Sequence, residues 1–213
     1  MSTIDTLVFD LGGVLLDWNP RYLYHGMFEG DHKKMEWFLA NVCTAEWNAE
    51  QDRGRPFTEG VREAKQRHPT WTVHIEAYQH RWPEMLAGPI AGSVNLLHTL
   101  RRENCRLLAL TNWSTETFPF ARAEHGFLDW FEGILVSGAE GLIKPDPAIF
   151  QLFTRRYAVD PSRALFIDDT LANVETARNC GFTAVLFRDP AQLQADLAAH
   201  GLLTEKPKDP QPL

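Results

Sequence analysis

The residues best suited to chemistry in this sequence stand at or beyond the ends of short apolar runs. They are Asp10, the pair Thr111 and Asn112, Lys144, and the pair Asp168 and Asp169. Each one alone has an ordinary interpretation, because such residues also form turns, cap helices or face solvent. If the apolar runs are parallel strands, however, their carboxyl ends share one edge of a sheet, where ligands bind in such folds. The sequence therefore predicts carboxylates, a hydroxyl and an ammonium at one edge.

This combination of groups suits the transfer of a phosphoryl group. Carboxylates crowded together repel one another, so a hard cation such as Mg²⁺ is their natural partner at neutral pH. The cation also allows an anionic carboxylate to approach an anionic phosphate. Lys144, Thr111 and Asn112 can share the remaining charge, and the glycines Gly12 and Gly13 let main-chain N–H groups come close to it. The predicted chemistry is transfer of the phosphoryl group to an aspartate, followed by hydrolysis.

Five apolar runs are continuous rather than alternating, which is typical of strands buried on both faces. They span Thr6–Asp10, Cys105–Asn112, Gly133–Gly138, Arg163–Asp169 and Thr183–Phe187. Helical patterns separate them. The spacing predicts one helix around Val94–Leu100, a second that Asp146 caps with Pro147 at its first position, and a third that Gly181 closes. This alternation predicts an α/β fold, with a parallel sheet covered by helices.

The stretch from Trp18 to Ala87 has a different pattern. It is charged, helical rather than strand-like, and rich in tryptophan (Trp18, Trp37, Trp47, Trp71 and Trp82). We interpret residues 18–87 as a helical cap inserted into a core that residues 1–17 and 88–200 form. A hinged lid over the site and a set of purely structural helices both remain open. The polar, proline-rich residues 201–213 are expected to be disordered.

Composition narrows the function classes. The chain has 213 residues and a formal net charge of −7, which argues against broad nucleic-acid binding because that needs a basic face. Its three cysteines have no metal-type spacing and indicate free thiols in a reducing compartment. There is no signal-peptide pattern, and no run approaches the roughly 18 apolar residues of a membrane span. We expect a cytoplasmic monomer or homodimer whose partner is a small phosphorylated metabolite, not a nucleic acid or a membrane.

Four segments carry a family resemblance. FDLGGVL, LTN, KPDPAIF and FIDDTLANVETA resemble, in order and spacing, the motifs of the haloacid dehalogenase-like hydrolase superfamily. The resemblance covers about Thr3–Pro190, and the helical insertion falls where one subfamily carries a small helical cap. It implies a Rossmann-like parallel sheet with the first strand at its centre.

The same resemblance implies a role for each candidate residue. Asp10 would be the nucleophile, Thr111 the hydroxyl that binds phosphate, and Lys144 the base that neutralises charge. Asn173 would support the lysine or the second acid. The implied magnesium ligands are Asp10, the main-chain carbonyl of Gly12, Asp168 and Asp169; the implied phosphate-binding groups are Gly12, Gly13, Thr111, Asn112 and Lys144.

Gly12 is a departure from the family pattern. Most phosphatases that this chain resembles have an aspartate at that position, which acts as general acid and base, a contribution of roughly 10²–10⁴-fold. Three interpretations stay open: a phosphatase similar to the sugar-1-phosphate branch, a 2-haloacid dehalogenase that needs no acid, and a catalytically weak protein that binds a phosphate ligand. Because dehalogenases of this superfamily generally lose one of the acids equivalent to Asp168 and Asp169, the retained pair favours the phosphatase.

A missing acid has a consequence for the substrate. Without help in protonating the leaving oxygen, turnover is expected to favour phosphates with good leaving groups, such as anomeric, acyl or aryl phosphates, over alkyl phosphates. Hydrolysis of the aspartyl phosphate would need another base, for which water polarised by the metal and a residue of the cap both stay open. Glu50, Asp52 and Arg53, and Asp17 at the first hinge, are candidates to face the site, with a solvated, charged helix face as the competing interpretation. Trp18 and Trp113 flank the expected mouth of the site, where they could stack on a sugar or simply pack.

Overall fold

The computed structural model describes residues 4–103 and 105–203 and contains a five-stranded parallel sheet. The strand order is β5 (Gly133–Val136), β4 (Arg106–Thr111), β1 (Thr6–Phe9), β6 (Ala164–Asp168) and β7 (Thr183–Leu186). All four neighbouring pairs are parallel. The predicted α/β fold with the first strand at the centre is therefore confirmed.

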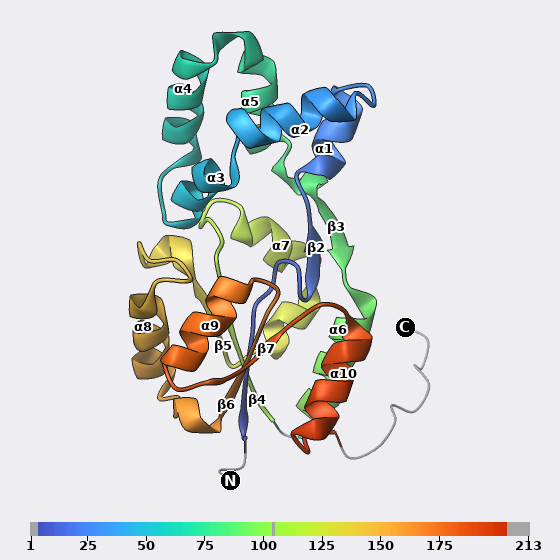
Figure 1. Ribbon diagram of the computed structural model, residues 1–213, viewed down its shortest axis with the longest axis vertical. Coiled ribbons are helices and arrows are strands. Elements are labelled where there is room, and N and C mark those ends of the chain that lie inside the picture. Colours follow the sequence, from blue (N-terminus) through green and yellow to red (C-terminus); the bar gives the residue numbers. More distant parts are fainter. Residues whose placement is uncertain (1–3, 104, 204–213) are drawn as a thin grey trace.

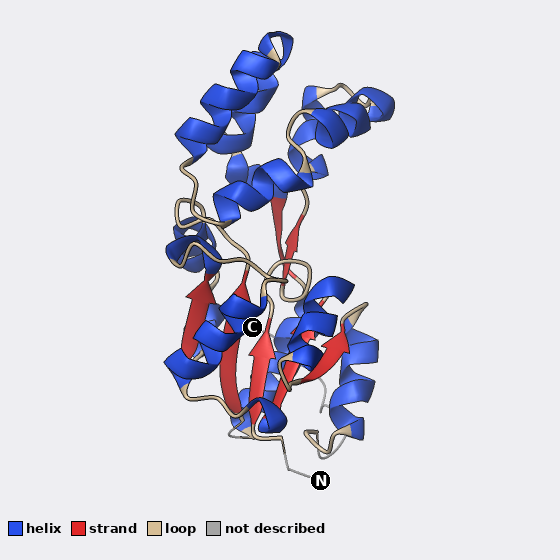
Figure 2. Ribbon diagram, turned by 60° about the vertical axis from the view of Figure 1, so that its left-hand side comes forward, coloured by secondary structure: helices blue, strands red, loops and turns tan. Residues whose placement is uncertain are grey.

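Helices cover both faces of this sheet (Figure 1 and Figure 2). On one face, α6 (Ala91–Arg102) and α10 (Pro190–Ala199) pack in the same core as Leu7 and Phe9 of β1. On the other face, α8 (Pro147–Tyr157) and α9 (Leu171–Asn179) pack in the core that contains Val8. Successive residues of β1 thus enter opposite cores, which explains the continuous apolar run.

The residues that the sequence predicts to begin and end helices make the expected local contacts. The Asp146 carboxylate accepts a hydrogen bond of 2.9 Å from the Ala148 N–H, and Pro147 is the first residue of α8. Gly181 ends the turn after α9 with a φ of +93°, a conformation that favours glycine. The remaining elements of the core are α7 (Phe118–Glu124) and the 3-10 helices η3 (Gly126–Trp130), η4 (Ser137–Ala139) and η5 (Pro161–Arg163).

A helical group stands beyond the carboxyl ends of the sheet strands (Figure 1). It comprises α1 (Arg21–Met27), α2 (His32–Asn41), α3 (Ala45–Asp52), α4 (Phe57–Arg67), α5 (Thr72–His80), η1 (Pro69–Trp71) and η2 (Trp82–Met85). Two strands that the sequence did not predict, β2 (Leu16–Trp18) and β3 (Leu86–Pro89), pair antiparallel where the chain leaves and re-enters the core. The two connections are therefore joined to each other rather than independent.

Aromatic side chains hold the helical group together. The Tyr24 ring lies 4.9 Å from the Phe38 ring, and the Trp47 ring lies 5.0 Å from the Tyr78 ring, as measured between centroids. Both tyrosines are buried, and the Tyr24 hydroxyl donates to the His74 carbonyl at 2.9 Å. The aromatic residues of this stretch thus supply its apolar packing, which is continuous with the core on the α6 and α10 face of the sheet.

The described chain ends just after α10. Leu202 is buried, and its N–H donates to the Leu197 carbonyl at 3.0 Å. Of the predicted disordered tail, residues 204–213 lie outside the described residues. Within the described part of the chain, no helix has the length and apolar character to cross a membrane.

Candidate active site

Asp10 directly follows β1, the central strand of the sheet. Its N–H donates to the Ile167 carbonyl at 2.8 Å, which extends the pairing with β6 by one residue. Its Oδ1 accepts a hydrogen bond of 2.7 Å from the Leu11 N–H. These bonds fix a buried carboxylate at the edge where β4 and β6 also end.

Lys144 reaches this edge from the loop that follows β5. Its side chain is fully buried, and its ammonium has one acceptor for each of its three protons. The Nζ atom lies 2.9 Å from Asp10 Oδ1, 2.7 Å from Asp168 Oδ2 and 2.8 Å from the Leu110 carbonyl oxygen. Lys144 is therefore held in a single position, next to Asp10.

Asp168, the last residue of β6, is fully buried and bound by the protein on several sides. Besides Lys144, it accepts from Asn173 Nδ2, which lies 2.9 Å from Oδ1 and 3.1 Å from Oδ2. The Thr170 N–H donates to Oδ1 at 2.9 Å. Asn173 thus contacts the second acid rather than the lysine, and Asp168 positions Lys144.

The electrostatics of this cluster show a shortage of positive charge. Burial raises the pKa of Asp10 to about 7, although the Lys144 ammonium lowers it. Burial and the charge of Asp168 raise the pKa of Asp169. Burial acts to lower the pKa of Lys144, but Asp10 and Asp168 outweigh it and hold that pKa above its usual value. One ammonium therefore serves several carboxylates.

The carboxylates fit a divalent cation. One oxygen each of Asp10, Asp168 and Asp169 lies within 4.8 Å of the others. Asp10 and Asp168 are buried, whereas Asp169 is exposed and open to solvent. Oxygen-only ligands of this kind suit Mg²⁺, which retains several waters when it binds.

Gly13 is the residue that allows Asp169 to approach. A Cβ at this position would lie 2.2 Å from Asp169 Oδ2, and the φ of Gly13 is +74°. We expect Gly13→Ala to displace Asp169 and to raise the Mg²⁺ concentration for half-maximal activity by about tenfold or more. The matched control for stability is Gly12→Ala, because a Cβ there meets nothing within 4 Å. Equal magnesium requirements of Gly13→Ala and the wild type would contradict this assignment.

Thr111, the last residue of β4, presents a hydroxyl that has no hydrogen-bond partner. It is 1% exposed, and its Oγ1 is one of three buried side-chain polar atoms in the described residues that lack a partner. A buried, unsatisfied hydroxyl costs about 1–3 kcal/mol. A group that is maintained at such a cost, at this edge of the sheet, is suited to a ligand.

Replacing this hydroxyl should separate stability from activity. We expect Thr111→Val to raise the free energy of unfolding by about 1 kcal/mol, because an apolar methyl replaces the unsatisfied hydroxyl. We expect the same variant to hydrolyse phosphate esters about 10²-fold more slowly, the usual effect of removing one donor to developing charge. Thr111→Ser keeps the hydroxyl and is the control. Urea unfolding and phosphate release measure the two effects, and a Val variant with wild-type turnover would rule out a role in binding.

Asn112 has a structural contact that sequence reasoning missed. Its Nδ2 donates to the Lys144 carbonyl at 2.9 Å, and its Oδ1 accepts from the Lys144 N–H at 2.8 Å. This two-point contact fixes the main chain that carries the lysine. The predicted donation from Asn112 to phosphate stays a prediction. The Asn side chain after a strand signalled a polar site, but no pattern in the sequence links it to Lys144.

A cavity of about 70 Å³ opens beside Gly12, between the sheet edge and the helical group. Its lining residues are Gly12, Trp18, Asn48, Asp52, Trp82, Asn112 and Trp113. Of the four cap candidates, Asp52 is the one that lines it. Glu50 and Arg53 form an exposed pair at 3.8 Å, and Asp17 accepts from the Tyr22 hydroxyl at 2.8 Å. Asn48 and Trp82 are further lining residues that the sequence did not indicate.

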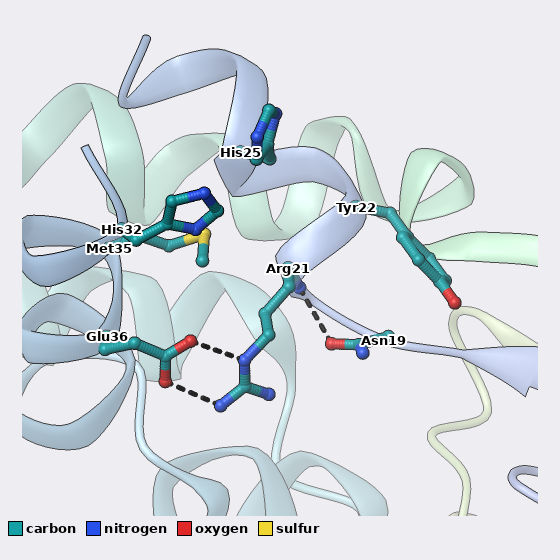
Figure 3. Close-up of a pocket in the computed structure, with 7 residues that line it drawn as sticks. All are labelled: Asn19, Arg21, Tyr22, His25, His32, Met35 and Glu36. Atoms are coloured by element: carbon teal, nitrogen blue, oxygen red, sulfur yellow. Dashed lines mark hydrogen bonds and ion pairs between the residues drawn. The ribbon is translucent and has the colours of Figure 1, made fainter. Parts of the chain in front are cut away.

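A second, larger cavity of about 480 Å³ lies within the helical group (Figure 3). It is lined by Asn19, Arg21, Tyr22, His25, His32, Met35 and Glu36. The Arg21 guanidinium, which would suit an anion, already makes a two-point ion pair with Glu36 at 2.6 and 2.7 Å. The predicted site residues line none of this cavity, so we place the site at the sheet edge.

The fold and the site define a hydrolase of the class that the motifs resemble. A sequence model of the haloacid dehalogenase-like hydrolase family matches residues 4–181. The chain belongs to this family.

Relatives and solved structures agree with that membership. The chain is 24% identical to the sesquiterpene phosphatase astK of Aspergillus oryzae, over 88% of this chain and 92% of that protein. A family enzyme of Bacteroides thetaiotaomicron, bt-2542, in complex with magnesium and inorganic phosphate, has a similar fold: TM-score 0.67, 23% identity, 87% of this chain and 95% of that one. The L-2-haloacid dehalogenase of Xanthobacter autotrophicus does too, with TM-score 0.60, 17% identity and coverage of 94% and 85%.

Proposed function

We propose that the chain is a magnesium-dependent phosphatase that acts on a small phosphorylated metabolite, with sugar 1-phosphates among the candidate substrates, through an aspartyl phosphate on Asp10. The observation that carries the proposal is the partnerless Thr111 hydroxyl at the same edge as three clustered carboxylates. An oxygen-rich, anionic ligand would accept a hydrogen bond from the Thr111 hydroxyl, and a cation would neutralise the carboxylates. A phosphatase among the relatives, and a similar fold that binds magnesium and phosphate, support this choice.

The residues divide the work as follows. The Asp10 carboxylate attacks phosphorus, and the phosphoryl group moves from the substrate oxygen to Asp10. Lys144 and the Thr111 hydroxyl stabilise charge on the phosphoryl oxygens, with Gly13 and Asn112 supplying donors or support. Asp10, Asp168, Asp169 and the Gly12 carbonyl would hold Mg²⁺, which supplies charge neutralisation that lets an anionic nucleophile meet an anionic substrate.

The retained acids favour this function over dehalogenation. A haloacid substrate brings one carboxylate and loses a halide, which needs no cation beside the nucleophile. Here Asp168 and Asp169 both remain within reach of Asp10, and Lys144 alone does not balance them. Phosphate transfer uses the cation that such a cluster attracts.

The test is phosphate release from a panel of sugar, acyl, aryl and alkyl phosphates, with Mg²⁺ and with a chelator. We expect release that depends on Mg²⁺ and that Asp10→Asn abolishes. Release that persists in the chelator would contradict the magnesium site. If no substrate of the panel releases phosphate and a 2-haloacid releases chloride, the chain is a dehalogenase and not a phosphatase.

A further inference from the structure

Gly12 leaves a chemical gap at the site. It has no side chain to exchange a proton with the leaving oxygen or with water, and nothing lies within 4 Å of where its Cβ would be. The cavity that opens beside Gly12 has one carboxylic acid among its lining residues, Asp52 at the end of α3. The acid that the core lacks is therefore matched by an acid that the helical group brings to the same cavity.

Contacts on both sides hold Asp52 in this place. Its Oδ2 accepts a hydrogen bond of 2.8 Å from Asn48 Nδ2, which also lines the cavity. Its main-chain carbonyl accepts from the buried Ser137 hydroxyl of the core at 2.5 Å. The main chain directly after α3 also lies against the core, because a Cβ at Gly54 would lie only 2.7 Å from the Gly138 carbonyl oxygen. Asp52 is thus anchored to the core as well as to its own helix.

The surroundings of the carboxyl keep a proton available. Burial raises the pKa of Asp52 to about 7, and the Ser114 N–H acts in the opposite direction. The neighbouring charged residues, Glu50 of α3 and Arg53 directly after it, pair with each other in solvent. Burial raises the pKa of the Tyr78 hydroxyl on α5. A general acid works best when its pKa lies near the operating pH. Asp52 meets that condition.

We propose that Asp52 is the general acid and base of the reaction, in place of the side chain that Gly12 lacks. The proposal rests on the phosphatase function proposed above and adds a catalytic residue to it. It also implies that wild-type turnover of alkyl phosphates is substantial, since the leaving oxygen receives a proton.

Asp52 gives up a proton in the first step of the proposed reaction and regains one in the second. As the bond between phosphorus and the leaving oxygen breaks, that oxygen keeps the bonding pair and takes the proton of Asp52, so the product leaves as an alcohol. Asp10 now carries the phosphoryl group, and Asp52 is a carboxylate. A water molecule attacks phosphorus and gives a proton to Asp52. Inorganic phosphate leaves, Asp10 regains its carboxylate, and Asp52 is protonated again.

The experiment compares leaving groups in the full chain. The rates of wild type, Asp52→Asn and Glu50→Gln are measured with p-nitrophenyl phosphate, whose leaving group needs no proton, and with glycerol 1-phosphate, whose leaving group does. We expect Asp52→Asn to lose about 10²-fold or more on the alkyl substrate and much less on the aryl one. Glu50→Gln removes an exposed carboxylate from the same helix and should match the wild type on both. Adding Gly12→Asp to Asp52→Asn should restore part of the alkyl rate.

The outcomes separate this inference from the proposed function. An equal loss on both substrates would mean that Asp52 only fixes the helical group, and no loss on either would mean that it has no role; both overturn the inference and leave the phosphatase in place. A wild type that releases phosphate from neither substrate overturns the phosphatase itself. Thermal unfolding of Asp52→Asn checks that the near-isosteric variant is folded.

Discussion

Asp10→Asn should reduce phosphate release by at least about 10³-fold, because an amide oxygen is a far weaker nucleophile than a carboxylate. The Leu11 N–H and the Lys144 ammonium hold the Asp10 carboxylate in place. Asparagine has the same shape, so the loss should arise from chemistry and not from packing. Phosphate release under saturating Mg²⁺ measures it.

The stability of this variant should change little. Burial makes the charged form of Asp10 costly, as its raised pKa shows, so a neutral amide removes an unfavourable charge as well as an ion pair. We expect the free energy of unfolding to stay within about 1 kcal/mol of the wild type. Asp5→Asn is the matched control, because Asp5 precedes the same strand and pairs with Arg163 at 2.6 Å in a half-exposed position. An Asp10→Asn variant as active as this control would remove Asp10 from the mechanism.

Lys144→Met should be damaging to both stability and activity. The lysine is fully buried, and its removal leaves Asp10 and Asp168 facing each other without the cation between them. Breaking a buried pair in this way costs about 3–5 kcal/mol. Activity should fall by about 10²-fold or more, since the charge that balances the phosphoryl oxygens is lost. Urea unfolding and phosphate release measure the two losses.

A double variant distinguishes charge from packing in this result. Asp168→Asn in the Lys144→Met background removes one of the stranded carboxylates, so the free energy of unfolding should recover by about 1 kcal/mol or more relative to the single variant. Lys33→Met, at an exposed position of α2, is the control for loss of a lysine. Additive effects of the two site substitutions would mean that Lys144 and Asp168 do not stabilise each other.

The sequence was sufficient for the parts of the fold that depend on local pattern. Continuous apolar runs identified all five strands of the parallel sheet, because a strand buried on both faces has no polar alternation to obscure it. β2 and β3 escaped prediction because they are three and four residues long and only partly buried, and β3 contains Gly88 and Pro89. Their pairing depends on residues about 70 positions apart.

Some features of the site were likewise predictable from the sequence, whereas others required the structure. Residue types and spacing placed Asp10, Lys144 and Asp168 at one edge, because parallel strands bring their ends together. Two features needed three dimensions: the two-point contact of Asn112 with the Lys144 main chain, and the position of Asp52 in the cavity. Helix α3 carries polar residues on several faces, so its pattern does not indicate which acid turns toward the core.

In the proposed mechanism, Asp10 carries the phosphoryl group during turnover. The most direct test is to quench the wild-type chain in acid during turnover of p-nitrophenyl phosphate with Mg²⁺, and to determine by mass spectrometry which peptide gains a phosphoryl group. We expect the gain on Asp10 in the peptide that contains it, and no gain in Asp10→Asn. Steady turnover by the wild type with the phosphoryl group on another residue, or turnover that Asp10→Asn retains, would contradict it.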